Sequence, residues 1–264
     1  MTNRVNDGEA KSAVRVVQIL ERLSDGDDPT LARLARDLEA PKSSIHSVVQ
    51  TLIGRGWVRR DAIGRLCIGT RALLVGCAHL DADPVVAMTS PVLDDLAAQL
   101  DETVHLGRLV GDDIVYLAKR ESTQPLRMFS AVGRRLPAHA TALGKVLLAH
   151  LPEDELQARL PERLEALTDA TITDRAELRA HLALVREQGW AADHGENSEG
   201  IACLAVALPM GDPPQDALSC SVPTVRFGPE RREGLLRHLM RARDDLAEVR
   251  GRRSSEGAPP GPRQ

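Results

Sequence analysis

The first seventy residues limit the fold more than any other part of the chain, because they carry three short amphipathic helical patterns in succession. SAVRVVQILERL (12–23) repeats apolar residues at helical spacing. TLARLARDLEA (30–40) opens on Thr30, a favoured N-cap residue. KSSIHSVVQTLIG (42–54) follows Pro41, which suits a first helical turn. The sequence therefore predicts three consecutive helices, each with one apolar face.

Two short extended segments follow the third helix. WVRR (57–60) and RLCI (65–68) flank DAIG (61–64), which has the composition of a turn. Three helices followed by a hairpin is the order of elements in a winged helix-turn-helix domain. We assign residues 12–69 to such a domain.

Basic residues are concentrated around the third helix and the hairpin. Residues 41–71 contain six Lys or Arg and a single acid, Asp61, although the whole chain carries a charge of −4. A basic region on an acidic protein is typical of a surface that binds a polyanion. Polar side chains opposite the apolar face of the third helix can reach base edges and phosphates. The alternative is an ordinary solvated helix face. The candidate contacts to double-stranded DNA are Lys42, Ser43, Ser44, His46, Ser47, Gln50, Arg55, Arg59, Arg60 and Arg65.

The rest of the chain mixes helical and strand patterns. A helical stretch over residues 70–84 is predicted to link the first domain to a second one over residues 85–250. Within that second domain the hairpin pattern TVHLGRLV-GDD-IVYLAKRE, several further strands, among them PLRMFSAV (125–132), and a closing helix indicate an α+β fold. Residues 1–11 and the Gly-, Pro- and Ser-rich residues 251–264 are predicted to be disordered.

Composition excludes several classes of protein. Aromatic residues make up 2% of the chain, too few for the stacking platforms of single-strand or RNA binding. The four cysteines and the histidines lack metal-ligand spacing, and no motif implies a cofactor. No signal peptide or membrane span is evident, which predicts a cytoplasmic protein with no membrane partner.

The motifs of both halves resemble the isocitrate lyase regulator (IclR) family of bacterial transcription regulators. The first half carries LARLARDLEAPKSSIHSVVQTLIGRGWVRRD, and the second carries LPAHATALGKVLLA, GENSEGIACLAVAL and ALSCSVP in the order typical of that family. The resemblance covers residues 12–250. It implies a winged helix-turn-helix joined by a linker helix to a GAF-like effector domain with a curved antiparallel sheet. It also implies dimers or tetramers bound to operator DNA and modulated by a small organic or aromatic acid. The function we predict is that of a repressor.

Two positions depart from the pattern of that family. Glu39 stands in the turn before the third helix, where members often carry Gly, so we expect the turn to change geometry. Ser47 stands where members often carry Arg, so we expect a different set of operator contacts.

The resemblance also places an effector pocket in the second domain. Its polar wall would come from Ser219 and Ser221, which point to the same side of a strand, and from Cys203. The free N–H groups around Thr141 and Gly144, at the start of a helix, would attract a carboxylate. The predicted pocket residues are Met128, Leu136, Ala142, Leu143, Asp193, Ile201, Cys203, Ser219 and Ser221.

Two other functions stay open at this point. Cys203 with His194 would give a thiol-dependent enzyme with a vestigial DNA-binding domain, although nothing in the sequence brings the two side chains together. A regulator whose pocket is only structural would bind DNA without an effector. We expect no enzymatic activity.

Overall fold

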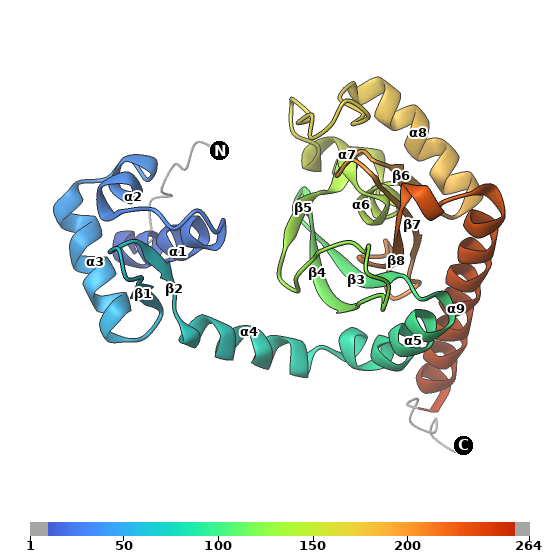
Figure 1. Cartoon of the computed structure of the whole chain (residues 1–264), viewed down its shortest axis with the longest axis horizontal. Coiled ribbons are helices and arrows are strands. Elements are labelled where there is room, and N and C mark those ends of the chain that lie inside the picture. Colours follow the sequence, from blue (N-terminus) through green and yellow to red (C-terminus); the bar gives the residue numbers. More distant parts are fainter. Residues whose placement is uncertain (1–9, 257–264) are drawn as a thin grey trace, which may run out of the picture. The chain divides into compact units, whose positions relative to one another are not determined.

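A computed structural model describes residues 10–256, and the chain divides into two compact units between Ala82 and Asp83. The N-terminal unit has the predicted winged helix-turn-helix (Figure 1). Its hairpin strands pair antiparallel, with Val58 opposite Ile68. Its elements are α1 (Lys11–Ser24), α2 (Leu31–Asp37), α3 (Lys42–Gly54), β1 (Val58–Arg60), β2 (Leu66–Ile68) and α4 (Thr70–Ala82).

The three helices and the hairpin share one aliphatic core. Its innermost side chains are Ile19 of α1, Leu34 of α2, Ile45 and Val49 of α3 and Leu66 of β2. The four helical residues come from the apolar faces that the sequence pattern indicates, and burying all five is the main stabilisation of so small a unit.

The turn between α2 and α3 keeps a left-handed geometry. Glu39 adopts a φ of 46° itself, so the expected change of geometry does not occur. A side chain at such a φ costs about 1 kcal/mol relative to Gly. At the other end of α2, the Thr30 hydroxyl accepts a hydrogen bond from the Arg33 N–H at 3.3 Å, as an N-cap should.

The linker helix α4 is solvent-exposed, and none of its residues is buried. It ends at Ala82, whereas the predicted linker continued to residue 84. Asp83 instead caps the next helix by accepting hydrogen bonds from the N–H groups of Val85 and Val86 at 2.9 and 3.3 Å. Within residues 10–256 no single helix is long and apolar enough to span a membrane. The helices Thr70–Ala82 and Pro84–Leu100 reach the necessary length and apolar composition only when they are counted together, and the chain bends by 82° between them.

The C-terminal unit is built on one six-stranded antiparallel sheet with the order β5-β4-β3-β8-β7-β6. The strands are β3 (Thr103–Val110), β4 (Asp113–Arg120), β5 (Arg135–Pro137), β6 (Ala191–His194), β7 (Ile201–Ala207) and β8 (Asp216–Pro223). The helices are α5 (Pro84–Leu100), η1 (Ala138–Ala140), α6 (Ala142–Leu148), α7 (Glu153–Arg159), α8 (Arg175–Gln188), η2 (Thr224–Arg226) and α9 (Pro229–Glu256). The predicted α+β effector domain with a curved antiparallel sheet is confirmed.

Helices cover both faces of this sheet. In Figure 1, α5 and α9 pack together on one face, and α6 lies on the other with α8 outside it. The strands under α6 present small residues, Ala205, Ala207 and Ala217, in the same buried cluster as Val146 and Leu147. Small side chains let the helix approach the sheet closely, so α6 runs through the centre of the unit.

Two glycines permit the close packing around α6. A Cβ on Gly144 would lie 2.0 Å from the carbonyl oxygen of Ala138, so only Gly fits where η1 meets the helix. A Cβ on Gly107 of β3 would lie 2.8 Å from a methyl group of Leu143. The HATALGK motif is therefore a packing motif as well as a wall of the cavity described below.

Several sequence predictions for this unit were wrong in detail. Residues 125–132 form no strand, because the edge of β4 pairs with β5 instead. Neither β5 nor the short helix α7 was predicted. Helix α9 continues to Glu256, past the predicted start of the disordered tail at residue 251, since no proline interrupts it before residue 259. In the predicted N-terminal tail, α1 already begins at Lys11. The remaining residues predicted to be disordered, 1–9 and 257–264, lie outside the described residues.

Candidate functional site

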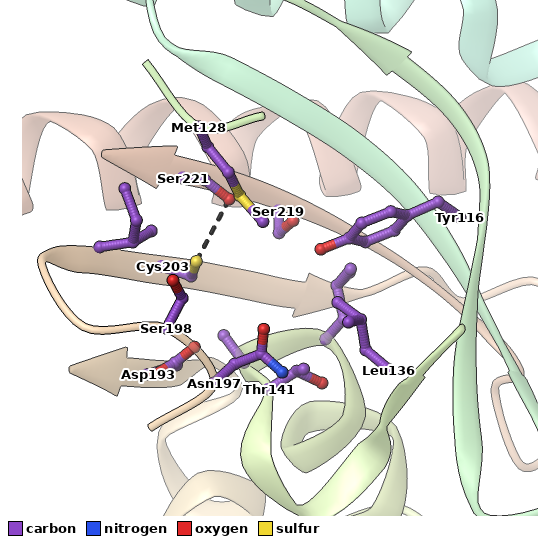
Figure 2. Close-up of a pocket in the computed structure, with 13 residues that line it drawn as sticks. Tyr116, Met128, Leu136, Thr141, Asp193, Asn197, Ser198, Cys203, Ser219 and Ser221 are labelled. Carbon is purple, nitrogen blue, oxygen red and sulfur yellow. Dashed lines mark hydrogen bonds between the residues drawn. The ribbon is translucent and has the colours of Figure 1, made fainter. Parts of the chain in front are cut away.

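A small cavity lies between α6 and the strands β6, β7 and β8 (Figure 2). The space between atoms, including the opening to solvent, is about 330 Å³. The cavity volume inside it that a water molecule can reach is only about 20 Å³. That room suits one or two water molecules. A larger ligand would need the walls to move apart.

All nine residues predicted for an effector pocket line this cavity. Four further residues line it: Thr141, which the sequence indicated only as part of a helix start that attracts a carboxylate, and Tyr116, Asn197 and Ser198, which it did not indicate as pocket residues. Asn197 and Ser198 belong to the GENSEG loop beside Asp193, so their position in the motif was an available signal. Tyr116 is the only tyrosine of the chain, and nothing in its strand pattern singled it out.

Strand register brings the polar side chains together. Asp193 on β6 pairs with Cys203 on β7, and Cys203 pairs with Ser221 on β8. Paired residues of neighbouring strands point to the same side of a sheet, so the three form one row across the cavity wall. The row is joined by a contact of 3.2 Å between Cys203 Sγ and Ser221 Oγ, drawn in Figure 2.

Asp193 is the only acidic or basic residue in the cavity lining. Its side chain is 3% exposed, and Oδ1 accepts a hydrogen bond of 2.6 Å from the Glu196 N–H. Burial raises the pKa of Asp193 to about 7, against the opposing effect of that hydrogen bond. Near neutral pH this carboxyl is therefore partly protonated and can donate as well as accept a hydrogen bond.

A buried ion pair lies close enough to Asp193 to act on its charge. Lys145 of α6 is completely buried, and its Nζ lies 2.5 Å from Oε1 of Glu196. Glu196 Oε2 is buried with no hydrogen-bond partner. The Glu196 carbonyl accepts a hydrogen bond of 2.6 Å from the Thr171 hydroxyl. These contacts fix the loop that follows β6, which carries Asn197 and Ser198 to the cavity.

The first turn of α6 offers fewer donors than predicted. Thr141 caps the helix, and its hydroxyl accepts the Gly144 N–H at 3.0 Å, so that donor is already occupied. The N–H groups of Ala142 and Leu143 have no partner within the helix, as in any first turn. Both residues line the cavity.

The arrangement does not favour a nucleophilic cysteine. Burial, followed by the nearby Asp193 carboxylate, raises the pKa of Cys203 well above its usual value, which keeps the thiol protonated. His194 follows Asp193 on β6, so it points to the opposite face and packs edge-on against Phe227. The base that a Cys203–His194 site requires is therefore not in place.

The loop between β4 and β5 contributes Met128 to the lining of the cavity. Ser130 tethers it, since its hydroxyl lies 2.8 Å from His105 Nε2 and its carbonyl accepts a hydrogen bond from Lys119. His105 stacks on Tyr116 with ring centroids 4.3 Å apart. Burial and the charge of Lys119 lower the pKa of His105 to about 3, so this tether stays neutral.

The N-terminal unit presents the predicted DNA contacts to solvent. All six candidates on α3 are exposed, on the side away from Ile45, Val49 and Leu52. Arg55, Arg59, Arg60 and Arg65 are exposed as well. Arg65 differs from the others because its Nε forms an ion pair of 2.9 Å with Asp61 inside the hairpin turn. That pairing gives Arg65 a structural role in the wing.

No group of three or more His, Cys, Asp or Glu that could hold a metal ion occurs within residues 10–256.

Comparisons with known proteins cover both units. Residues 12–62 match the profile described as the IclR helix-turn-helix domain, and residues 77–248 match the profile described as the C-terminal region of the bacterial transcriptional regulator IclR. The transcriptional repressor IclR of Escherichia coli strain K12 is 30% identical over 230 residues, which is 85% of this chain and 84% of that protein.

Two solved structures have the same fold. An IclR transcriptional regulator from Alicyclobacillus acidocaldarius superposes with a TM-score of 0.80 at 26% identity, covering 91% of this chain and 98% of that one. An IclR homolog from Microbacterium hydrocarbonoxydans, crystallised with 4-hydroxybenzoate, gives a TM-score of 0.73 at 23% identity over 89% of this chain and 97% of that one. At that identity the second comparison shows the fold alone.

Proposed function

The chain belongs to the IclR family of bacterial transcriptional regulators, and we propose that it is a repressor that binds operator DNA as an oligomer and responds to a small organic acid. A helix-turn-helix domain and an effector-binding domain are the two parts that such a regulator needs. The repressor assignment is supported by the name of the Escherichia coli relative.

The observation that carries the DNA-binding proposal is the exposed polar face of α3 beside the basic hairpin. His46 and Gln50 stand one helical turn apart with Ser43 on the same exposed side, a spacing that suits base edges in the major groove. Arg59 and Arg60 on β1 would contact phosphates. The helix would then determine sequence preference and the hairpin would add affinity for any sequence.

Binding to the DNA upstream of the gene tests this proposal. A labelled duplex of that region should be retarded more strongly than a random duplex of equal length, and both should bind less tightly as salt rises from 50 to 200 mM. His46→Ala and Gln50→Ala should reduce the preference between the two duplexes. Absence of retardation, or equal retardation of both duplexes, would contradict the assignment.

The proposed effector site is the cavity in the C-terminal unit. Hydroxyl groups of Tyr116, Ser219 and Ser221 and the amide of Asn197 are neutral hydrogen-bonding groups around apolar walls. Burial raises the pKa of Tyr116, so its hydroxyl remains a donor. A few polar groups on apolar walls suit a compact ligand with one carboxylate and a further polar group.

The charge of Asp193 sets a condition on that ligand. An anion beside an ionised carboxylate is repelled, so an acid binds best when Asp193 is protonated. The affinity for an acid should therefore be highest below about pH 7 and should fall as the pH rises above it.

A thermal-shift screen of small organic and aromatic acids, including 4-hydroxybenzoate, tests the effector proposal. A ligand of the native state raises the melting temperature in proportion to the logarithm of its concentration. Ser219→Ala and Asn197→Ala should reduce that rise, whereas Ser90→Ala on α5, outside the cavity lining, should not. If no acid shifts the melting temperature at pH 6, the cavity is structural and the regulator is constitutive.

Light scattering tests the oligomer. The proposal requires a mass of at least twice 28.6 kDa. A monomer at the concentration used for DNA binding would contradict it.

A further inference from the structure

A second cavity lies wholly within the N-terminal unit, and none of its lining residues belongs to the effector pocket predicted from the sequence. It is a groove open to solvent, with about 830 Å³ of space between atoms including its opening, and it lies between the end of α3, the strand β1 and the first turn of α4. Its lining residues are Ile53, Gly56, Val58, Arg59, Arg60, Gly69, Thr70, Arg71 and Leu74. We call it the arginine groove, because three of these nine residues are arginines and none is acidic.

The backbone fixes the arginine groove firmly. The Gly69 N–H donates to the Trp57 carbonyl at 2.7 Å, and the Arg71 N–H donates to the Gly56 carbonyl at 3.2 Å. A Cβ on Gly69 would lie 2.3 Å from the Gly56 carbonyl oxygen, so the two backbone segments are in direct contact. The start of α4 is thus held against the end of α3 and the hairpin, which fixes the backbone of Arg71 where this residue lines the groove.

The three guanidinium groups of the arginine groove lack anionic partners. Among the described residues no carboxylate forms an ion pair with Arg59, Arg60 or Arg71, and Arg60 donates only to the Gly64 carbonyl at 3.2 Å. Elsewhere in the same unit arginines are paired, as Arg22 is with Asp27 at 2.7 Å. Clustered, unpaired guanidinium groups repel one another, and a polyanion relieves that repulsion.

We propose that the arginine groove binds a phosphate of the DNA backbone, and that Arg71 is a DNA contact together with Arg59 and Arg60. This inference rests on the proposed DNA-binding function and extends it to a residue outside the helix-turn-helix and its hairpin. Three unpaired arginines in an open groove suit a phosphodiester, and the groove adjoins the wing next to α3.

The groove also links DNA binding to the linker helix. Arg71 is the second residue of α4, so a phosphate held by Arg71 is held by the linker itself. Bound DNA would then hold the first turn of α4 against α3 and the hairpin. A rearrangement of that turn would therefore change DNA affinity even if the residues of α3 stayed in place.

Fluorescence anisotropy tests the groove in the full-length protein, with the upstream duplex and a random duplex titrated between 50 and 200 mM KCl. Arg71→Gln should weaken binding to both duplexes by the same factor, about 3- to 10-fold at 100 mM KCl, and should lower the slope of log K against log salt by about 1. Arg71→Lys should keep most of that slope, because the charge remains. The matched control is Arg241→Gln, which removes an 84% exposed arginine from α9 in the other unit and should change neither value.

Three outcomes separate the possibilities. An unchanged salt slope in Arg71→Gln, with wild-type binding intact, overturns the groove and leaves the proposed function standing. A loss of affinity for only one of the two duplexes also overturns it, because it would mean base contact. Failure of the wild-type protein to bind either duplex contradicts the proposed function itself. Unfolding curves of Arg71→Gln should match those of the wild type, since its side chain is exposed.

Discussion

The charged side chains of the two candidate sites, one in each unit, are placed in opposite ways. In the N-terminal unit the arginines around α3 and the hairpin are exposed, and Arg59 and Arg71 have no acidic partner among the described residues. In the C-terminal unit Lys145, Asp193 and Glu196 are buried within a short stretch of α6, β6 and the loop that follows. Exposed charges cost the fold little and remain available to a partner, whereas buried charges depend on one another.

This difference predicts what substitutions should do. Removing an exposed arginine should change binding and leave stability nearly unchanged, because surface charges contribute little to folding. Removing a buried charge should change stability first, since its partner is left uncompensated in a medium of low dielectric.

The largest effect should follow the loss of Lys145. Lys145→Met leaves the buried Glu196 carboxylate without its partner at 2.5 Å, which should lower the free energy of unfolding by about 3–5 kcal/mol. The double variant Lys145→Met with Glu196→Leu should recover most of that loss, because no charge is then left unpaired. Urea unfolding measures both variants.

The exposed pair of Arg241 and Asp245 on α9 is the control for that experiment. Arg241→Gln should change the free energy of unfolding by less than about 0.5 kcal/mol. An equally small effect of Lys145→Met would mean that the buried pair does not support the fold, and the comparison between the units would fail.

The second effect concerns pH. The folded protein keeps a proton on Asp193 up to about pH 7, whereas the unfolded chain loses it near pH 3.8, so the stability supplied by this group is lost as pH rises between these values. Asp193→Asn removes that loss and can still accept the Glu196 N–H. At pH 8 it should be more stable than the wild type by roughly 2–4 kcal/mol. Urea unfolding at pH 4, 6 and 8 measures this, and equal pH dependence of the two proteins would contradict the assigned protonation.

The third effect belongs to the exposed arginines of the hairpin. Arg59→Gln with Arg60→Gln should reduce affinity for every DNA duplex by roughly 10- to 100-fold at 100 mM salt. The free energy of unfolding should change by less than about 0.5 kcal/mol. A large loss of stability instead would mean that these arginines support the hairpin fold.

The smallest effect is expected at Glu39. Glu39→Gly relieves a left-handed φ of 46° and should raise stability by about 1 kcal/mol or less, with DNA affinity unchanged. Thermal unfolding measures it. A destabilised variant would show that the Glu39 side chain has a favourable contact that outweighs the strained backbone.

How well the sequence predicted the fold depended on how local each signal was. The helix-turn-helix domain was predicted well because its signals are local: Thr30 and Pro41 mark the starts of α2 and α3, and the apolar positions of α3 recur within a few residues. PLRMFSAV (125–132) was predicted as a strand, but strand formation needs a partner. That partner edge is taken by β5.

Sequence motifs predicted nine of the residues that line the cavity, and residues without a motif signal were missed. All nine predicted positions came from the resemblance, and for Ser219 and Ser221 the strand pattern added that both side chains point to the same side. Tyr116 reaches the cavity through the register of β3, β4 and β8, which no local pattern encodes. The Lys145–Glu196 pair joins residues 51 positions apart. A lysine set among apolar residues in ALGKVLLA was the one local sign of its burial.

The central claim is that a ligand in the cavity of one unit controls DNA binding by the other. It is tested most directly by measuring the affinity of the full-length protein for the upstream duplex at pH 6, with and without a saturating amount of the acid that raises its melting temperature most. The account predicts a change of at least about 5-fold, the lower range for coupling between two sites. It also predicts that Asn197→Ala, which weakens the acid, shifts the change to higher acid concentration. An affinity for DNA that stays the same at saturating acid would contradict it.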